Sequence, residues 1–404
     1  MEFGFPLVLD GATGTELQKR GFDGAEAAES WVLEHPNTIR EIQQGYLDAG
    51  SQVLYASTFG ANRVKLEQHR VFNKVKDYNL RLTALSKDVA KGRALVAGDL
   101  APTGEFLYPL GEMQFEELVE VYREQAAALE EAGVDLFVIE PMMTLPEARA
   151  AVLAVREVSR KPIFVTMTCD ENGKTLTGTD VVAALVVLQG MGVDAFGLNC
   201  SAGPDTMLMQ LRRLTPYAEI PLIAKPNAGM PNVVDGKTVY DCGAEEFVSL
   251  VREMAAAGVQ IFGGCCGTEA SHIAALSKAV KGLQMREPAP AYSDLLPCAT
   301  EKDACYVPAD AAYESVLTCS ADLEDDLMDA QEEGELLALA IRSEADLDEF
   351  AEVQYLIRKP LCFACEDAKL LEQALRLYQG RALYEGGLDD EALFPLVRKY
   401  GLII

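Results

Sequence analysis

The sequence predicts an α/β protein. Residues 1–285 are expected to form a (β/α)8 barrel of the TIM type, followed by a smaller α/β unit. Eight short, apolar, β-rich runs are each followed by a longer stretch with helical spacing. Strands that alternate with helices are typical of parallel βαβ units, and eight such units close into a barrel. The runs cover residues 7–10, 52–58, 94–100, 136–141, 163–168, 195–200, 222–227 and 260–266.

The stretches between these runs have the pattern of amphipathic helices. In residues 115–132, apolar side chains recur every three or four positions and fall on one helix face. Several stretches end in a glycine that can serve as the C-cap, at Gly50, Gly133, Gly192 and Gly258. The alternative is an open doubly wound sheet, which is typically marked by a GxGxxG turn after the first strand. The turn Gly11-Ala12-Thr13-Gly14 lacks that spacing, and this favours the barrel.

The predicted strands end in polar residues, as expected for a barrel enzyme whose site lies at the carboxyl ends of its strands. A sheet with a structural role alone has no need for such ends. The polar ends are Asp10, Thr58, Asp99, Glu140, Thr168, Asn199 with Cys200, Lys225 with Asn227, and Cys265 with Cys266.

After the barrel, the pattern predicts a linker at 286–300 and a small α/β domain at 301–404. The linker contains Glu287-Pro288-Ala289-Pro290-Ala291. The strongly acidic run 322–335 is interpreted as a solvated loop or helix face. Beyond it, the expected strands are 336–341, 361–365, 381–384 and 402–404, and the expected helices are 343–357, 368–378 and 391–400.

Composition excludes several classes of function. The chain has 404 residues and a net charge of −28, which argues against nucleic acid or an anionic membrane as a partner. No run of about 20 apolar residues exists, and the N-terminus does not resemble a signal peptide. We therefore expect a cytoplasmic protein, whose cysteines serve metal binding or catalysis rather than disulfides.

Three cysteines at two strand ends predict a metal site. Cys200 ends one predicted strand, and the adjacent Cys265 and Cys266 end another. Neighbouring strand residues point to opposite faces, so the backbone must turn there, and Gly264 and Gly267 permit it. The alternative is buried structural cysteines. Three thiolates and one open position suit a catalytic zinc, which can bind a substrate thiol and lower its pKa.

Other strand-end residues are candidates for substrate contacts. Glu140 can be a surface carboxylate or a partner for a substrate ammonium group. Asp10 has the same alternatives, and the backbone N–H groups that follow it can bind a carboxylate. Asn227 is either a turn residue or a hydrogen-bonding group of the site. No histidine ends a strand, and Cys362 and Cys365 are expected to be buried.

Four segments together resemble the homocysteine S-methyltransferase family. They are residues 9–17 (LDGATGTEL), 197–201 (GLNCS), 225–229 (KPNAG) and 263–268 (GGCCGT). The resemblance covers roughly residues 1–285 and is closest to the homocysteine-binding barrel of cobalamin-dependent methionine synthase.

The resemblance implies zinc-dependent methyl transfer to the thiol of homocysteine, giving methionine. It assigns zinc to Cys200, Cys265 and Cys266. It assigns the amino-acid end of homocysteine to the region of Asp10, Ala12, Thr13 and Glu140, with Asn227 nearby. The expected methyl donor is a methyl-corrinoid protein, which would supply methylcobalamin as a partner. S-methylmethionine or S-adenosylmethionine comes second, and betaine third.

Two further expectations concern alternatives and the tail. A non-catalytic zinc-thiolate scaffold in a corrinoid complex is the alternative from a different class. The last 60 or so residues faintly resemble the start of a pterin-binding barrel, but that fragment is too short to close one. We therefore expect the tail to bind neither folate nor cobalamin. We expect it to pack on the barrel, on a second copy of the chain or on a corrinoid protein.

Overall fold

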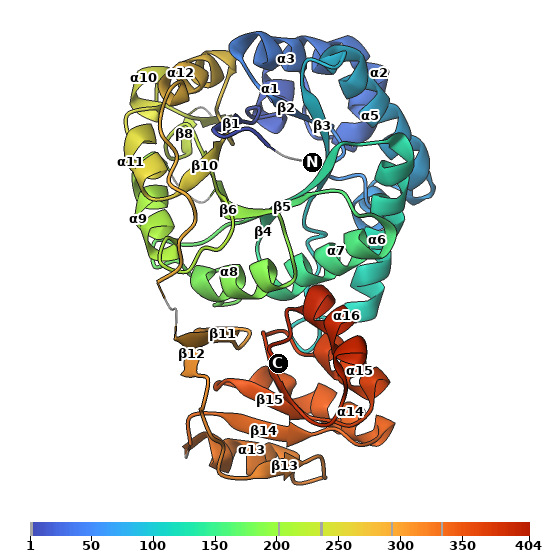
Figure 1. The fold of residues 1–404 in the computed structure, drawn as a ribbon. Coiled ribbons are helices and arrows are strands. Elements are labelled where there is room, and N and C mark those ends of the chain that lie inside the picture. Colours follow the sequence, from blue (N-terminus) through green and yellow to red (C-terminus); the bar gives the residue numbers. More distant parts are fainter. Residues whose placement is uncertain (1–2, 201–202, 235–236, 292–293, 333) are drawn as a thin grey trace.

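Eight parallel strands form a ring in the first two thirds of the chain (Figure 1). The computed structural model describes residues 3–200, 203–234, 237–291, 294–332 and 334–404. The ring order is β1-β10-β7-β6-β5-β4-β3-β2, and a hydrogen bond of 2.7 Å from Gln52 N to Val8 O joins its two ends. The predicted barrel is confirmed. Its strands are β1 (Leu7–Val8), β2 (Val53–Tyr55), β3 (Leu95–Leu100), β4 (Leu136–Met142), β5 (Ile163–Met167), β6 (Ala195–Cys200), β7 (Leu222–Pro226) and β10 (Val259–Phe262).

Helices surround this ring, as the helical spacing predicted. The four glycines expected after helices all adopt left-handed backbone, for example Gly50 at φ 107° and Gly133 at φ 73°. The helices are α1 (Gly14–Lys19), α2 (Ala28–Glu34), α3 (Pro36–Ala49), α4 (Arg63–Gln68), η1 (Phe72–Lys74), α5 (Val75–Ala90), α6 (Phe115–Ala132), α7 (Leu145–Val158), α8 (Val181–Gly190), α9 (Pro204–Leu214), α10 (Ala244–Phe247), α11 (Val251–Ala256) and α12 (Ala270–Val280). A small hairpin of β8 (Asn232–Val234) and β9 (Lys237–Val239) follows β7.

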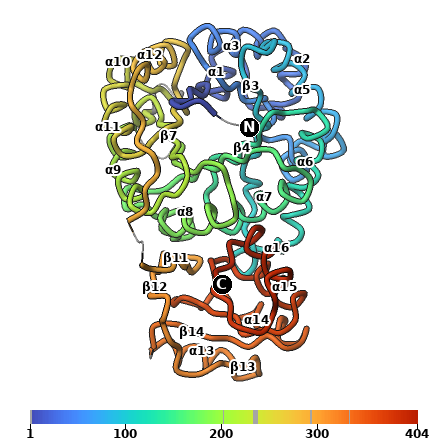
Figure 2. The backbone as a smooth tube through the Cα atoms, in the orientation of Figure 1, coloured from blue at the N-terminus to red at the C-terminus, as the bar shows by residue number. Residues whose placement is uncertain are grey.

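The remaining chain forms a second α/β unit beside α7 and α8 (Figure 1). Residues 281–291 run along the outside of the barrel to reach it, as the tube in Figure 2 shows. Its parallel sheet contains β13 (Val316–Thr318), β14 (Leu337–Ala340), β15 (Leu361–Ala364) and β16 (Leu383–Glu385), in that order. Its helices are α13 (Leu323–Glu332), α14 (Glu344–Val353), η2 (Gln354–Leu356), α15 (Ala368–Leu377) and α16 (Asp390–Tyr400). The expected strand 402–404 is reduced to a single bridge between Ile403 and Leu383.

An unpredicted antiparallel hairpin completes this unit. Its strands are β11 (Leu295–Ala299) and β12 (Ala304–Pro308), so β11 lies within the segment expected to be a linker. Cys298 and Val307 of the hairpin pack with Ala338 and Cys362, on one face of the sheet. The intervening residues, such as Leu339, join the core on the other face. The hairpin therefore covers one apolar face of a parallel sheet, which needs cover on both faces.

The two units share a buried seam. Every residue from Val181 to Gln189 in α8 is buried, because one side of α8 meets the barrel and the other meets β11, β12 and α16. Arg149 of α7 is fully buried in the same seam. Its Nη1 donates to Gln379 Oε1 at 2.7 Å and its Nη2 to Leu375 O at 3.0 Å. Burial lowers the pKa of Arg149 to about 10, so the guanidinium stays charged at neutral pH.

None of the described helices has the length and apolar character needed to cross a membrane.

Candidate metal centre

The three predicted cysteines meet at the carboxyl end of the barrel. Cys265 Sγ lies 3.2 Å from Cys200 Sγ, and Cys266 Sγ lies 3.7 Å from it. All three sulfur atoms lie within 4.8 Å of one another, and all three residues are half-buried. Within the described ranges, no other three His, Cys, Asp or Glu residues come together in this way. The cluster offers three soft ligands and one side that solvent or a substrate can reach.

The backbone after β10 explains how two adjacent cysteines reach one point. The strand was predicted to continue to Cys266, but it ends at Phe262. From there the N–H groups alternate between two neighbours: Gly263 N bonds to Ala224 O, and Gly264 N bonds to Asp10 O. Cys265 N then returns to β7 through Pro226 O. This alternation is that of a strand between two neighbours and reaches as far as Cys265. The chain then turns, with Thr268 N bonded back to Cys265 O, so Cys266 lies in the turn and its side chain does not have to alternate with that of Cys265.

Glycine is required at this turn by close approach. A Cβ atom on Gly264 would lie 2.4 Å from Thr268 Oγ1, and one on Gly267 would lie 2.3 Å from the ring of Tyr240. Gly267 also has φ +80°, which favours glycine. On the other strand, Cys200 itself adopts φ 64°. A non-glycine residue in that region is under strain, and such strain is concentrated at functional sites.

Thr268 ties the cysteine turn to the loop after β1. Its hydroxyl donates to Cys265 O at 2.7 Å and accepts from Ala12 N at 3.1 Å. Tyr46 on α3 donates to both segments, at 2.7 Å to Ala12 O and 3.2 Å to Thr268 O. The two loops that carry the predicted metal and substrate residues are therefore held as one piece.

The thiols of the cluster strongly affect one another. Hydrogen bonds from Cys200 and Cys265 lower the pKa of Cys266 far below that of an ordinary thiol. The hydrogen bonds with Cys200 and Cys266, together with burial, raise the pKa of Cys265. Without a metal, the cluster thus favours one thiolate stabilised by two thiols. A bound cation would allow all three cysteines to ionise, because it would neutralise thiolates that otherwise repel one another.

Beside the cysteines, the barrel mouth holds buried charges. Lys225 Nζ forms an ion pair with Glu140 Oε1 and lies 3.9 Å from the centre of the Tyr55 ring. Asp10 Oδ2 accepts from Tyr55 N at 2.7 Å. Burial raises the pKa of Asp10 to about 7, although the positive charge of Lys225 opposes this. Burial alone would lower the pKa of Lys225, but the charges of Glu140 and Asp10 raise it, so the ammonium persists.

Several acceptors at this mouth are buried without a hydrogen-bond partner among the described residues. They are Glu140 Oε2, Asp99 Oδ1 and Asn227 Oδ1. Burial, and then the charge of Glu140, raise the pKa of Asp99 well above its ordinary value. Buried polar atoms are nearly always paired in proteins. Open acceptors of this kind can be satisfied by the N–H donors of a primary ammonium group.

The structure places the other predicted residues as follows. Ala12 N donates to Thr268 Oγ1 at 3.1 Å, and its predicted contact with the substrate stays a prediction. Thr13 precedes α1, whose first N–H groups have no acceptor within the helix. His272 caps α12 and does not approach the cysteines. Cys362 and Cys365 are buried, as predicted.

Sequence reasoning assigned no role to Lys225, Asp99 or Thr268. Lys225 had a usable signal, because a lysine inside the apolar run Leu222–Pro226 must be paired when that strand is buried. Nothing in the sequence indicated that its partner would be Glu140, which lies 85 positions away. Thr268 was part of a motif, but its bridging role depends on the close approach of two loops.

The chain is similar to known proteins over its barrel. The family model described as Homocysteine S-methyltransferase matches residues 7–280. The methionine synthase of Mycobacterium leprae is 32% identical over 292 residues, which cover 68% of this chain and 24% of that protein. The methionine synthase of Mycobacterium tuberculosis is 31% identical over 299 residues, covering 70% and 25% respectively. The chain spans about a quarter of the length of these curated relatives.

Solved structures show the same fold. The metallated form of the homocysteine methyltransferase MmuM from Escherichia coli matches with a TM-score of 0.57 at 24% identity. The match covers 67% of this chain and 95% of that one. The oxidized form of the same protein matches with a TM-score of 0.58.

Proposed function

Because the chain belongs to the homocysteine S-methyltransferase family, we propose that it transfers a methyl group to the thiol of homocysteine, giving methionine. In this reaction the sulfur gains the methyl carbon and loses its proton. The observation that carries the proposal is the three-cysteine cluster beside a buried, carboxylate-rich mouth. The cysteine cluster suits the thiol of the substrate, and the carboxylate-rich mouth suits its amino-acid end.

Zinc fits the cysteine cluster by the chemistry of its donors. Cys200, Cys265 and Cys266 would hold it, and their sulfur atoms already lie within 4.8 Å of one another. Bound there, zinc would supply a Lewis acid that lowers the pKa of the substrate thiol. The half-buried cysteines leave an open side for that thiol. A metallated form is known for a protein of similar fold, which is consistent with this assignment.

The carboxylates of the mouth would bind the amino end of homocysteine. Glu140 Oε1 forms the ion pair with Lys225, and Glu140 Oε2 would accept a hydrogen bond from the substrate ammonium. Asp10 and Asn227 lie within the same mouth, and Asp99 adds a further open acceptor. The N–H groups at the start of α1, near Thr13, would receive the substrate carboxylate.

The methyl donor is proposed to be a methyl-corrinoid protein carrying methylcobalamin. Large apolar side chains are exposed on loops that follow five strands, at the same end of the barrel as the cysteines. They are Phe59, Phe106, Tyr108, Leu110, Met143, Leu176 and Met230. Exposed apolar groups gathered at one end favour a macromolecular donor. S-methylmethionine, S-adenosylmethionine and betaine are the alternative donors.

The second unit is proposed to support the barrel and to bind neither folate nor cobalamin. Leu402 and Ile403 are buried, Ile403 against Leu383 and the β11–β12 hairpin of the same unit, and α16 packs on α8 of the barrel. A corrinoid protein or a second copy of the chain remains a predicted partner of the exposed surface of this unit.

A methyl-transfer assay with homocysteine and each donor in turn tests the proposal. We expect methionine from at least one donor, and methyl-cobalamin protein to be the best. Cys265→Ser should lose both zinc and activity, whereas Cys319→Ser, a half-buried cysteine of the second unit, should keep both. Zinc content without turnover or homocysteine binding would support the scaffold alternative instead. Unchanged zinc in both Cys265→Ser and Cys200→Ser would refute the metal assignment.

A further inference from the structure

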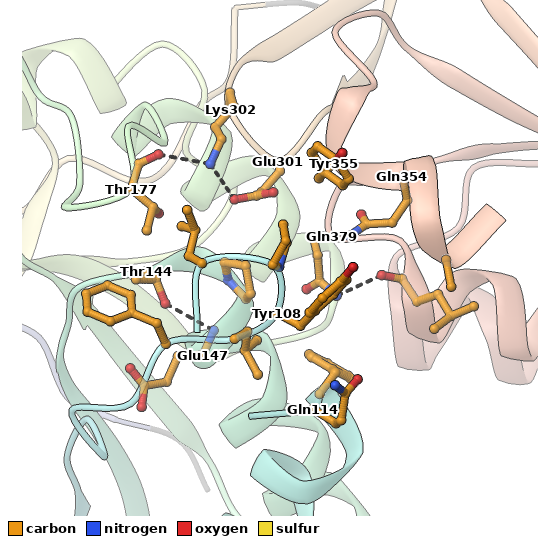
Figure 3. A pocket seen from close by; sticks show the side chains of 18 of the residues that line it. Tyr108, Gln114, Thr144, Glu147, Thr177, Glu301, Lys302, Gln354, Tyr355 and Gln379 are labelled. Atoms are coloured by element: carbon orange, nitrogen blue, oxygen red, sulfur yellow. Dashed lines mark hydrogen bonds and ion pairs between the residues drawn. The ribbon is translucent and has the colours of Figure 1, made fainter. Parts of the chain in front are cut away.

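A cavity of about 420 Å³ lies in the seam between the two units, away from the cysteines. Figure 3 shows it between the loop after β3, which carries Tyr108, and the η2 segment, which carries Gln354 and Tyr355. Its volume is within the range of small-molecule sites, which occur preferentially at domain interfaces.

The walls of this seam cavity are held in place by the contacts that join the units. Arg149 binds Gln379 and Leu375 O in the buried seam, and Gln379 lines the cavity. On another side, Lys302 Nζ donates to Thr177 O at 2.9 Å. These bonds connect α7 to α15 and the β11–β12 turn to the loop before α8. The cavity is therefore preformed, which reduces the entropy cost of binding.

Aromatic rings form much of the lining. Phe106, Tyr108 and Tyr355 are 41%, 53% and 36% exposed, although each borders the cavity. Phe115 also lines it, and the Arg149 guanidinium lies 5.8 Å from the centre of its ring. The faces of such rings attract flat ligands and cations.

Two polar atoms at the cavity have no partner among the described residues. Gln354 Oε1 comes from the second unit and Thr177 Oγ1 comes from the barrel, and both atoms are withdrawn from solvent. An amide oxygen can only accept a hydrogen bond. A ligand that satisfies Gln354 must therefore carry an N–H or O–H donor.

The charges at the cavity favour a cation. Lys302 is neutralised by its ion pair with Glu301. Arg358, whose Nη1 donates to Tyr355 O at 2.7 Å, keeps its charge and is the remaining cation of the described lining. Glu105 has no ion-pair partner in the described chain, and Glu352 receives only a 3.4 Å contact from the Tyr108 hydroxyl. An anion would meet these carboxylates, whereas a cation would neutralise them.

We propose that the seam cavity binds a small organic cation that has a flat ring and at least one N–H donor. The ring would lie among Phe106, Tyr108 and Tyr355. The N–H group would donate to Gln354 Oε1 once the half-buried Gln354 side chain turns this atom toward the cavity. The bound cation would touch both units. This site includes none of the cysteines or paired charges of the barrel mouth, although Phe106, Tyr108 and Leu110 also belong to the exposed apolar surface proposed for the methyl donor. The inference does not depend on the proposed methyl transfer.

Three related probes test the charge and the donor separately on the full chain. Benzamidine is a flat cation with N–H donors, benzamide is its neutral counterpart, and phenyltrimethylammonium is a cation without N–H. We expect saturable binding of benzamidine with a Kd of about 1 mM or tighter, measured by calorimetry or saturation-transfer NMR. Benzamide and phenyltrimethylammonium should each bind at least about fivefold more weakly. Equal affinity for all three probes, or no binding of benzamidine, would overturn the proposal.

Variants locate the bound probe. Gln354→Leu and Tyr355→Leu should each weaken benzamidine binding at least about fivefold, with thermal unfolding unchanged. Phe394→Leu, an exposed aromatic on α16 outside the cavity, is the matched control and should bind normally. Benzamidine could also reach the acidic barrel mouth. Binding that is lost in Glu140→Gln but kept in Gln354→Leu would place the probe there and refute the seam site.

Discussion

Replacing Glu140 by Gln isolates the charge that is proposed to hold the substrate ammonium. Glu140 Oε1 is engaged by Lys225, while Oε2 is buried without a partner. The Gln side chain keeps the size and one oxygen acceptor, so Lys225 still has a hydrogen-bond partner. The loss of the Glu140 charge also removes one cause of the raised pKa of Asp10, so Asp10 ionises more readily beside Lys225. We therefore expect the variant to fold and to retain zinc.

The expected loss follows from one charge-assisted hydrogen bond. Such a bond contributes about 1.5–3 kcal/mol, which corresponds to a roughly 10- to 150-fold increase in the Kd of homocysteine. 4-Mercaptobutyrate has the thiol and the carboxylate but lacks the amino group, so its Kd should not change. Calorimetry on the zinc-loaded protein measures both ligands, and metal analysis checks the zinc.

A matched control removes a different buried carboxylate. Glu147 lies at the start of α7, where it accepts from Thr103 and Tyr122, and Glu147→Gln changes the net charge by the same amount. It should leave homocysteine binding unchanged. If Glu140→Gln weakens homocysteine and 4-mercaptobutyrate equally, Glu140 acts through the fold or the metal, and the assignment to the ammonium group fails.

Three further predictions concern pH and the second unit. Burial raises the pKa of Asp10 to about 7, against the charge of Lys225 and reinforced by that of Glu140, so the folded chain retains a proton that the unfolded chain releases above about pH 4. The contribution of Asp10 to the free energy of unfolding should fall as pH rises from about 4 to 7, by at most about 1.4 kcal/mol per pH unit. Urea unfolding of Asp10→Asn should lack this decrease. A decrease identical to that of the unchanged protein would contradict the prediction. Arg149→Met should lower the free energy of unfolding, measured in urea, by about 2–4 kcal/mol, because it removes two charged hydrogen bonds and leaves Gln379 Oε1 without its donor. A decrease below about 0.5 kcal/mol would show that the seam does not depend on Arg149. Deleting residues 300–404 should make the barrel aggregate, since it uncovers α8; a truncated barrel with equal solubility, oligomeric state and donor use would show that the second unit has no supporting role.

Local patterns in the sequence were sufficient for the barrel. Strands such as Leu95–Leu100 and Ala195–Cys200 match their predicted ranges within a residue. Short apolar runs between amphipathic helices are typical of buried parallel strands. The convergence of Cys200 with Cys265 followed from the same pattern, since parallel strands bring their carboxyl ends to one edge. Zinc binding and the substrate roles of Asp10, Glu140 and Asn227 remain predictions.

The tail was harder to predict because its cover comes from elsewhere in the chain. Strand β11 contains Pro297 and closely follows the proline-containing run 287–291, so it resembled a linker. The uniformly apolar helix Val181–Gly190 could have predicted this contact. A barrel helix without a polar face must be covered on its outer side.

The sequence by itself determined the order and type of the barrel elements and the positions at which reactive side chains follow strands. These features depend on neighbouring residues, which share one backbone segment and one periodicity. Outside the cysteine cluster, only the tertiary structure decided which side chains meet. Lys225 pairs with Glu140 across 85 positions, and Thr268 joins Ala12 to the cysteine turn. Such contacts depend on strand register and loop approach over distances at which the local pattern carries no information.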